Sequence, residues 1–233
     1  DLGLLSGVAR DQVAAMVNWW NDIALPAGTG YRALRSVPIG AADPRTFIDG
    51  GGNVAQGTLA AEIAGAAGAG KLRVVGHSLG GHLATTFASL FHDQVAHVAT
   101  FNSAGLFVTG AVSTMFSKLL LGDALTQAAQ VIGHAVQLPD AAIQDNYYAA
   151  AGLNFTTSDL AFIQRGERIP VQTEYTNEFS LTPFANHAQY KLTDALALYR
   201  AFGQLDPDAP LDALGGLAAR SSTQPAASLE ATQ

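Results

Sequence analysis

The chain of 233 residues contains no cysteine. This absence excludes a disulfide framework and any metal site that depends on thiolate ligands. The sequence also has no Asp- and Asn-rich loop with glycine of the kind that binds calcium. We therefore expect a fold that is held together by its apolar core and that uses no metal and no other cofactor.

Charged residues are also scarce. They make up 13% of the chain, compared with about 25% in an average soluble domain, and the formal net charge is −7. A nucleic-acid-binding protein needs clustered positive charge for the phosphate backbone, and no dense run of Lys and Arg occurs here. No apolar run reaches the roughly 20 residues that cross a bilayer. We therefore expect neither a nucleic-acid partner nor a transmembrane segment.

What the chain does contain is an alternation of helical and strand-like segments. Helical hydrophobic periodicity occurs at residues 8–25, 59–67, 82–91 and 192–205. Short apolar or β-branched runs predict strands at residues 31–39, 72–75, 95–101, 144–150 and 169–174. Such alternation is typical of the α/β class, so we predict one domain over residues 1–212 with a central, mostly parallel sheet flanked by helices.

Three other segments have a different character. Residues 40–53, with Pro44 and three consecutive glycines, are typical of a loop. Residues 213–233, rich in Ala, Ser, Gln and Thr, predict a linker-like tail. Residues 106–139 are helical in pattern and unusually apolar. This last stretch predicts either a lid over a site for water-insoluble substrates or a core helix.

The most informative motif lies between the predicted strand at 72–75 and the helix after it. It is Gly76-His77-Ser78-Leu79-Gly80, a G-x-S-x-G pattern. Such a turn strains the serine backbone so that Oγ projects from the sheet, and small residues let strand and helix approach. The N–H of Leu79, at the positive end of the helix, can then bind an oxyanion. We predict Ser78 as a nucleophile and Leu79 as an oxyanion donor.

Residues 74–82 resemble the serine-lipase signature of α/β-hydrolases, in particular bacterial lipases and the class 3 lipase group. The wider chain resembles the lipase-like domain of large secreted bacterial proteins with calcium-binding repeats, through residues 98–105, 186–199 and 205–207. This resemblance implies a carboxylic ester hydrolase, with triacylglycerol or phospholipid acyl esters as substrates. It also implies transient contact with a lipid interface and a secreted, extracellular location.

His187 is the predicted general base. In α/β-hydrolases the order along the chain is serine, acid, histidine. His187 stands in a late loop before the predicted helix at 192–205. The five other histidines lie in the turn itself, beyond the helix that follows it, or in the apolar stretch. His187 is therefore the one whose position fits that order.

The acid is a choice between two carboxylates. Asp159 lies in the loop after the predicted strand at 144–150, where the fold places this residue. Glu174 ends the later strand candidate at 169–174 and is the alternative. Asn154 stands where some lipases have the acid, and an amide would stabilise an imidazolium less well.

Two further hypotheses concern the whole protein. Only one clear strand, at 31–39, precedes the serine motif, and residues 1–71 offer no convincing second oxyanion donor. We therefore expect the parent protein to continue upstream of Asp1. The alternative to an ester hydrolase is a non-catalytic hydrolase-like module that acts as a spacer or binds a partner. A third hypothesis keeps the chemistry and changes the substrate to a thioester, an amide or an acyl-transfer acceptor.

Overall fold

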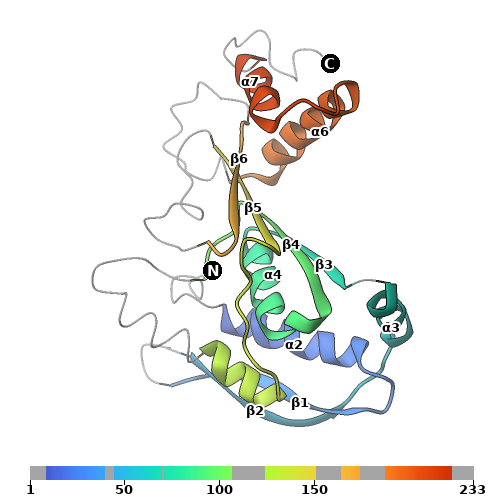
Figure 1. Cartoon of the computed structure of the whole chain (residues 1–233). Helices are drawn as coiled ribbons and strands as arrows, with labels where there is room; N and C mark the ends of the chain where they lie inside the picture. Colours follow the sequence, from blue (N-terminus) through green and yellow to red (C-terminus); the bar gives the residue numbers. More distant parts are fainter. Residues whose placement is uncertain are drawn as a thin grey trace.

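The centre of the molecule is a four-stranded parallel sheet. The computed structural model describes residues 9–39, 45–69, 71–106, 124–150, 164–173 and 187–221. The strands lie in the order β3 (Leu72–His77), β4 (Val95–Phe101), β5 (Gln144–Ala149) and β6 (Glu167–Val171), as Figure 1 shows. Because helices pack against this sheet, the predicted α/β class is confirmed.

Different helices cover the two faces of the sheet. Side chains alternate along a strand, so Val98 of β4 faces the opposite way from Phe101. Val98 packs with α2 (Arg10–Ala24) and α4 (Leu79–Leu90) in the larger core. Phe101 packs with α6 (Gln189–Leu205) and α7 (Leu211–Ser221) in the smaller one. α4 lies on β3 and β4, and α6 lies on β5 and β6, while α2 packs against α4 and a second, two-stranded sheet and α7 packs against α6.

A second, separate sheet corrects one prediction. Residues 45–53 were expected to belong to a loop, but they lie in β2 (Arg45–Val54), which pairs antiparallel with β1 (Gly30–Pro38). The glycines give this segment no periodic apolar signal. Its stability comes from the hydrogen bonds that pair it with β1. The residue pattern within the segment itself does not reveal this pairing. Residues 40–44 lie outside the described part of the chain.

The remaining predicted elements are found close to their expected positions. The helix expected at 59–67 is α3 (Ala60–Ala69), and a one-turn 3-10 helix, η1 (His92–Gln94), links α4 to β4. The tail expected to be linker-like begins inside α7, whose Leu214 is buried in the smaller core. Within the described ranges, none of the helices is both long and apolar enough to span a bilayer.

The described part of the apolar stretch 106–139 contributes to the core. Residues 124–132 are helical, and Ala124, Ala128 and Ala129 are at most 2% exposed within the larger core. Residues 107–123, which hold the rest of the possible lid, lie outside the described residues. The segment that is described therefore packs as a core helix.

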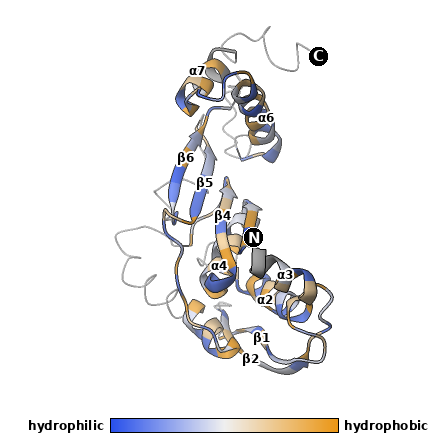
Figure 2. Ribbon diagram, turned by 45° about the vertical axis from the view of Figure 1, so that its right-hand side comes forward, coloured by the Kyte–Doolittle hydropathy of each residue, from blue (hydrophilic) through white to orange (hydrophobic). Residues whose placement is uncertain are grey.

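A buried polar network joins the middle of the sheet to α4. β5 and β6 are largely hydrophilic in Figure 2. Even so, Gln144 and Asn146 of β5 are at most 3% exposed, as is Thr100 of the neighbouring β4. Asn146 Oδ1 accepts hydrogen bonds from Thr100 Oγ1 (2.7 Å) and Gln144 Nε2 (2.9 Å). Asn146 Nδ2 donates to the carbonyl oxygens of Glu167 (3.0 Å) and Arg165. Burial of these groups is offset by the hydrogen bonds that they make, although Gln144 Oε1 has no partner among the described residues.

We expect Asn146→Leu to lower the free energy of unfolding by about 2–4 kcal/mol, since two donors and two carbonyl oxygens would lose their buried partner. Asn53→Leu is the matched control. Asn53 is exposed in β2, and an exposed substitution changes stability by about 0.5 kcal/mol or less. Urea unfolding of both variants measures the difference. Equal stabilities of the two variants would show that the network contributes nothing.

Candidate active site

Ser78 occupies a strained turn at the carboxyl edge of the sheet. Its backbone has φ 54° and ψ −121°, a conformation that L-residues rarely adopt. The Ser78 N–H continues the ladder by donating to the carbonyl oxygen of Phe101 (3.0 Å). The Ser78 carbonyl then accepts from the N–H groups of Gly81 (3.1 Å) and His82 (3.3 Å), which begin α4. The geometry is that of a strand-to-helix turn with the serine at its tip.

The glycines of the motif have unequal roles. A Cβ on Gly76 would overlap the backbone of Gly80 and lie 2.5 Å from the nitrogen of Gly81. A Cβ on Gly81 would lie 2.5 Å from Cβ and Oγ of Ser103, which follows β4. A Cβ on Gly80, by contrast, would meet open space. The expectation that the second motif glycine is required for space is therefore wrong, and Gly81 makes the close approach instead.

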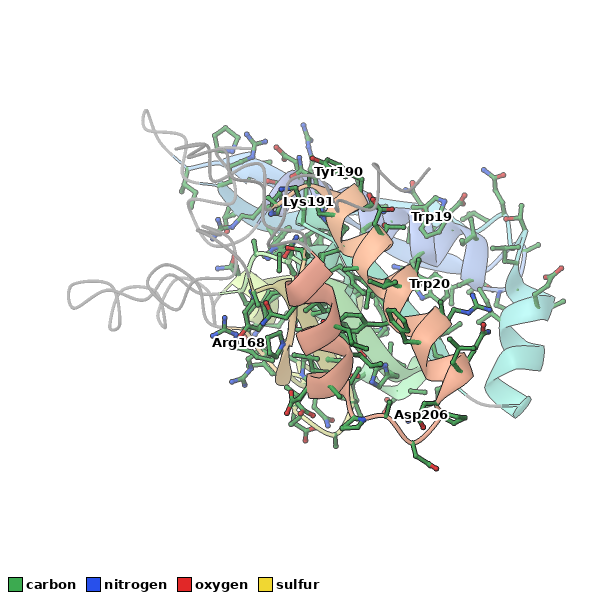
Figure 3. All side chains as sticks on the ribbon, turned by 90° about the horizontal axis from the view of Figure 1, so that it is seen from above. Trp19, Trp20, Arg168, Tyr190, Lys191 and Asp206 are labelled. Carbon is green, nitrogen blue, oxygen red and sulfur yellow. The ribbon has the colours of Figure 1, made fainter. Side chains whose placement is uncertain are left out.

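His187 lies against Ser78 although 109 residues separate them. The distance from His187 Nε2 to Ser78 Oγ is 2.6 Å, a short hydrogen bond between half-buried side chains. His187 stands two residues before α6, whose beginning is marked in Figure 3 by Tyr190 and Lys191. In the tautomer with a proton on Nδ1, Nε2 accepts the Ser78 hydroxyl proton. The structure thus brings together two of the predicted site residues.

The surroundings of His187 favour its neutral form. Burial lowers the pKa of His187 below its usual 6.5, and the charge of the nearby His77 lowers it further. A neutral imidazole has a lone pair on the nitrogen that faces Ser78, as a general base requires. The pair is therefore ready for proton transfer at neutral pH.

Leu79, the predicted oxyanion donor, is the first residue of α4. The first N–H groups of a helix have no acceptor within it, and they lie at its positive end. The Leu79 N–H therefore lies beside Ser78 without a helical partner. Among the described strands, β3 is at the edge of the parallel sheet.

Both candidate acids, Asp159 and Glu174, lie outside the described residues, as does Asn154. The strands that precede these residues show at which edge of the sheet the two segments begin. Asp159 belongs to the segment after β5, and Glu174 to the segment after β6. Both segments leave from the carboxyl edge where Ser78 lies, because the strands are parallel. The choice between the two carboxylates stays open.

The other histidines are held elsewhere. Fully buried His82 accepts the N–H of Ala9 at Nε2 (3.4 Å), and burial lowers its pKa to about 4. His97 Nε2 lies 3.2 Å from Asp145 in the adjacent strand. The remaining contacts are those of His92 with Asp93 and of His134 with the carbonyl oxygen of Leu90. None of these side-chain contacts involves the Ser78 hydroxyl.

Asn102 is a positioning residue that the sequence analysis missed. It has a left-handed backbone (φ 43°), is fully buried and follows β4 directly. Its N–H donates to the Tyr147 carbonyl oxygen, and its Oδ1 accepts the Ala149 N–H, both at 2.9 Å. Asn102 therefore fixes the end of β5 beside the elbow. An asparagine directly after a buried strand was the available signal, because asparagine tolerates positive φ better than most residues.

One apolar cavity among the described residues lies away from this pair. It has a volume of about 380 Å³, lies among α2, α3 and the end of α4, and is lined by Trp20, Ile63, Leu72 and Phe91 among others. Leu72 begins β3, so this cavity is at the amino edge of the sheet, whereas Ser78 is at the carboxyl edge. Across the same ranges, no group of three His, Asp or Glu residues is placed to hold a metal ion.

Comparison of the chain with protein-family models, curated proteins and solved structures gave no match. The functional argument therefore depends on the site itself and on the motif around Ser78.

Proposed function

We propose that the protein is a serine hydrolase that cleaves carboxylic esters through an acyl-enzyme on Ser78. The observation that carries the proposal is the 2.6 Å contact between His187 Nε2 and the hydroxyl of a strained, half-buried serine. A nucleophile and a base within hydrogen-bond reach are the signature of nucleophilic catalysis. Backbone strain at the same residue is a cost that a purely structural turn would avoid.

The proposed reaction has two halves. Ser78 Oγ bonds to the acyl carbon while its proton passes to His187 Nε2, and the carbonyl electrons move to an oxyanion at the Leu79 N–H. Collapse of this intermediate expels the alcohol, which takes the proton from His187. Water then attacks the acyl-enzyme with His187 again as base, and this releases the carboxylic acid and restores Ser78. Asp159 or Glu174 would orient the imidazole through Nδ1.

The substrate class rests on the motif. Gly76-His77-Ser78-Leu79-Gly80-Gly81 is similar to the signature of class 3 and other bacterial lipases, which supports triacylglycerol or phospholipid acyl esters as substrates. The same resemblance supports a secreted bacterial protein that contacts a lipid interface while it acts. The proposed chemistry uses the chain's own side chains and needs no cofactor.

Covalent labelling tests the proposal directly. A fluorophosphonate probe should label the native wild-type protein at Ser78, because the probe requires an activated serine. Ser78→Ala should not be labelled, whereas Ser89→Ala, which changes a buried serine farther along α4, should be labelled like the wild type. A panel of fatty-acyl esters, thioesters and amides then identifies the substrate. If native wild-type protein takes no label, the non-catalytic module is the better explanation.

A further inference from the structure

We propose that His77, the residue before the nucleophile, is a positioning residue that anchors the main chain of His187. The proposal rests on the proposed function, since positioning matters only if His187 is the base. It assigns a role to a motif position that the reaction itself does not use.

The anchoring contact is a hydrogen bond between the His77 side chain and the His187 backbone. His77 Nε2 lies 3.0 Å from the carbonyl oxygen of His187. A carbonyl oxygen only accepts, so the proton of this bond resides on His77 Nε2 and His77 donates. The two rings are near each other as well, with centroids 5.2 Å apart and planes tilted by 41°.

The two partners differ in how firmly the fold holds them. His77 is the last residue of β3 and pairs in register with Phe101 of β4, so its backbone belongs to the parallel sheet. His187 precedes α6, and Ala188 between them has an extended backbone. The contact therefore links a chain segment outside the sheet to a rigid strand end.

This link restrains the direction of the His187 ring. The imidazole is held at Nε2 by Ser78 and its own backbone carbonyl is held by His77. Because the ring and the carbonyl belong to one residue, loss of the His77 bond would let the residue shift as a whole. A misplacement of about 1 Å at a reacting group can cost on the order of 100-fold in rate.

The test compares two substitutions of His77. His77→Phe keeps the ring shape and removes the donor, while His77→Gln keeps an N–H donor at nearly the same reach. We expect His77→Phe to lower kcat for ester hydrolysis by roughly 10- to 100-fold with KM little changed. His77→Gln should recover most of that loss. His97→Phe, in a half-buried histidine of β4 that contacts Asp145, is the matched control and should leave kcat unchanged.

The pH profile adds a readout that a merely structural role would not move. The His77 charge lowers the pKa of His187, after burial. His187 acts as a base only when it is neutral, so kcat/KM of the wild type should decline at acidic pH with a midpoint below pH 6.5. In both His77 variants this midpoint should move to higher pH. His77→Gln should thus recover most of kcat, while the midpoint of its pH dependence stays at the higher pH. The same rise in the His187 pKa should appear by NMR in the Ser78→Ala background, where catalysis is absent.

Each outcome has a defined meaning. Equal kcat for wild type and His77→Phe, with both folded by thermal melting and labelled at Ser78, would overturn the positioning role. Failure of His77→Gln to recover rate, with its fold intact, would also overturn it. If His77→Phe does not fold, His77→Leu, which also lacks a donor, takes its place in the comparison of kcat with His77→Gln. Absence of label on the wild type would instead reject the proposed function.

Discussion

Replacing Ser78 or His187 by alanine is expected to reduce kcat for ester hydrolysis by roughly 10⁴- to 10⁶-fold, the range found when a serine nucleophile or its histidine is removed. The two side chains meet at 2.6 Å, so one cannot act without the other. The double variant should therefore be no slower than either single variant. Steady-state kinetics on a soluble short-chain ester measures all three.

His134→Ala is the control for this set. His134 bonds to the Leu90 carbonyl oxygen at the far end of α4, and its replacement should leave kcat within a few-fold of the wild type. Losses that multiply in the double variant would show that Ser78 and His187 act in separate steps. Full activity of Ser78→Ala would reject Ser78 as the nucleophile.

Gly76→Ala is expected to abolish activity and to destabilise the fold by about 3 kcal/mol or more. The added methyl group would overlap the Gly80 backbone, and backbone cannot yield as a flexible side chain can. The turn would have to open, which would move Ser78 away from His187. Urea unfolding and kcat should both report the loss.

Gly80→Ala is the matched control within the same motif. Its methyl group would point into open space in the first turn of α4. Alanine favours a helix interior by about 1 kcal/mol over glycine, so this variant should be as stable as the wild type or slightly more stable. If Gly80→Ala is as damaging as Gly76→Ala, close packing is not the reason for glycine at position 76.

The elements around the elbow could be predicted because their signals are local. β3, β4 and α4 each carry an apolar run or a helical period, and the glycines mark the turn between them. β2 could not be predicted in this way. Its glycine-rich sequence becomes a strand only through pairing with β1. β5 was predicted as a strand, but its buried polar network was not, because Asn146 and Gln144 find their partners on α4, β4 and the segment that contains β6 only in the folded chain.

Part of the candidate site followed from chain order, and the rest did not. Ser78 was predicted from its motif, and His187 from its place in a late loop before the helix expected at 192–205. Order along the chain says nothing of a distance, however, and the contact between these two side chains depends on how α6 docks on β5 and β6. The anchoring of His187 by His77 depends on the same docking.

By itself, the sequence determined the α/β class, the turn that presents Ser78 and the helix that begins at Leu79, because short-range sterics and periodicity decide such features. Only the tertiary structure decided which glycine is needed for packing, that His187 Nε2 lies 2.6 Å from Ser78 Oγ, and what holds this histidine in place. The two contacts of His187 join residues 109 and 110 positions apart, and the Gly81 contact reaches Ser103 in the next strand–loop segment. They exist once the sheet brings the carboxyl ends of its strands to one edge.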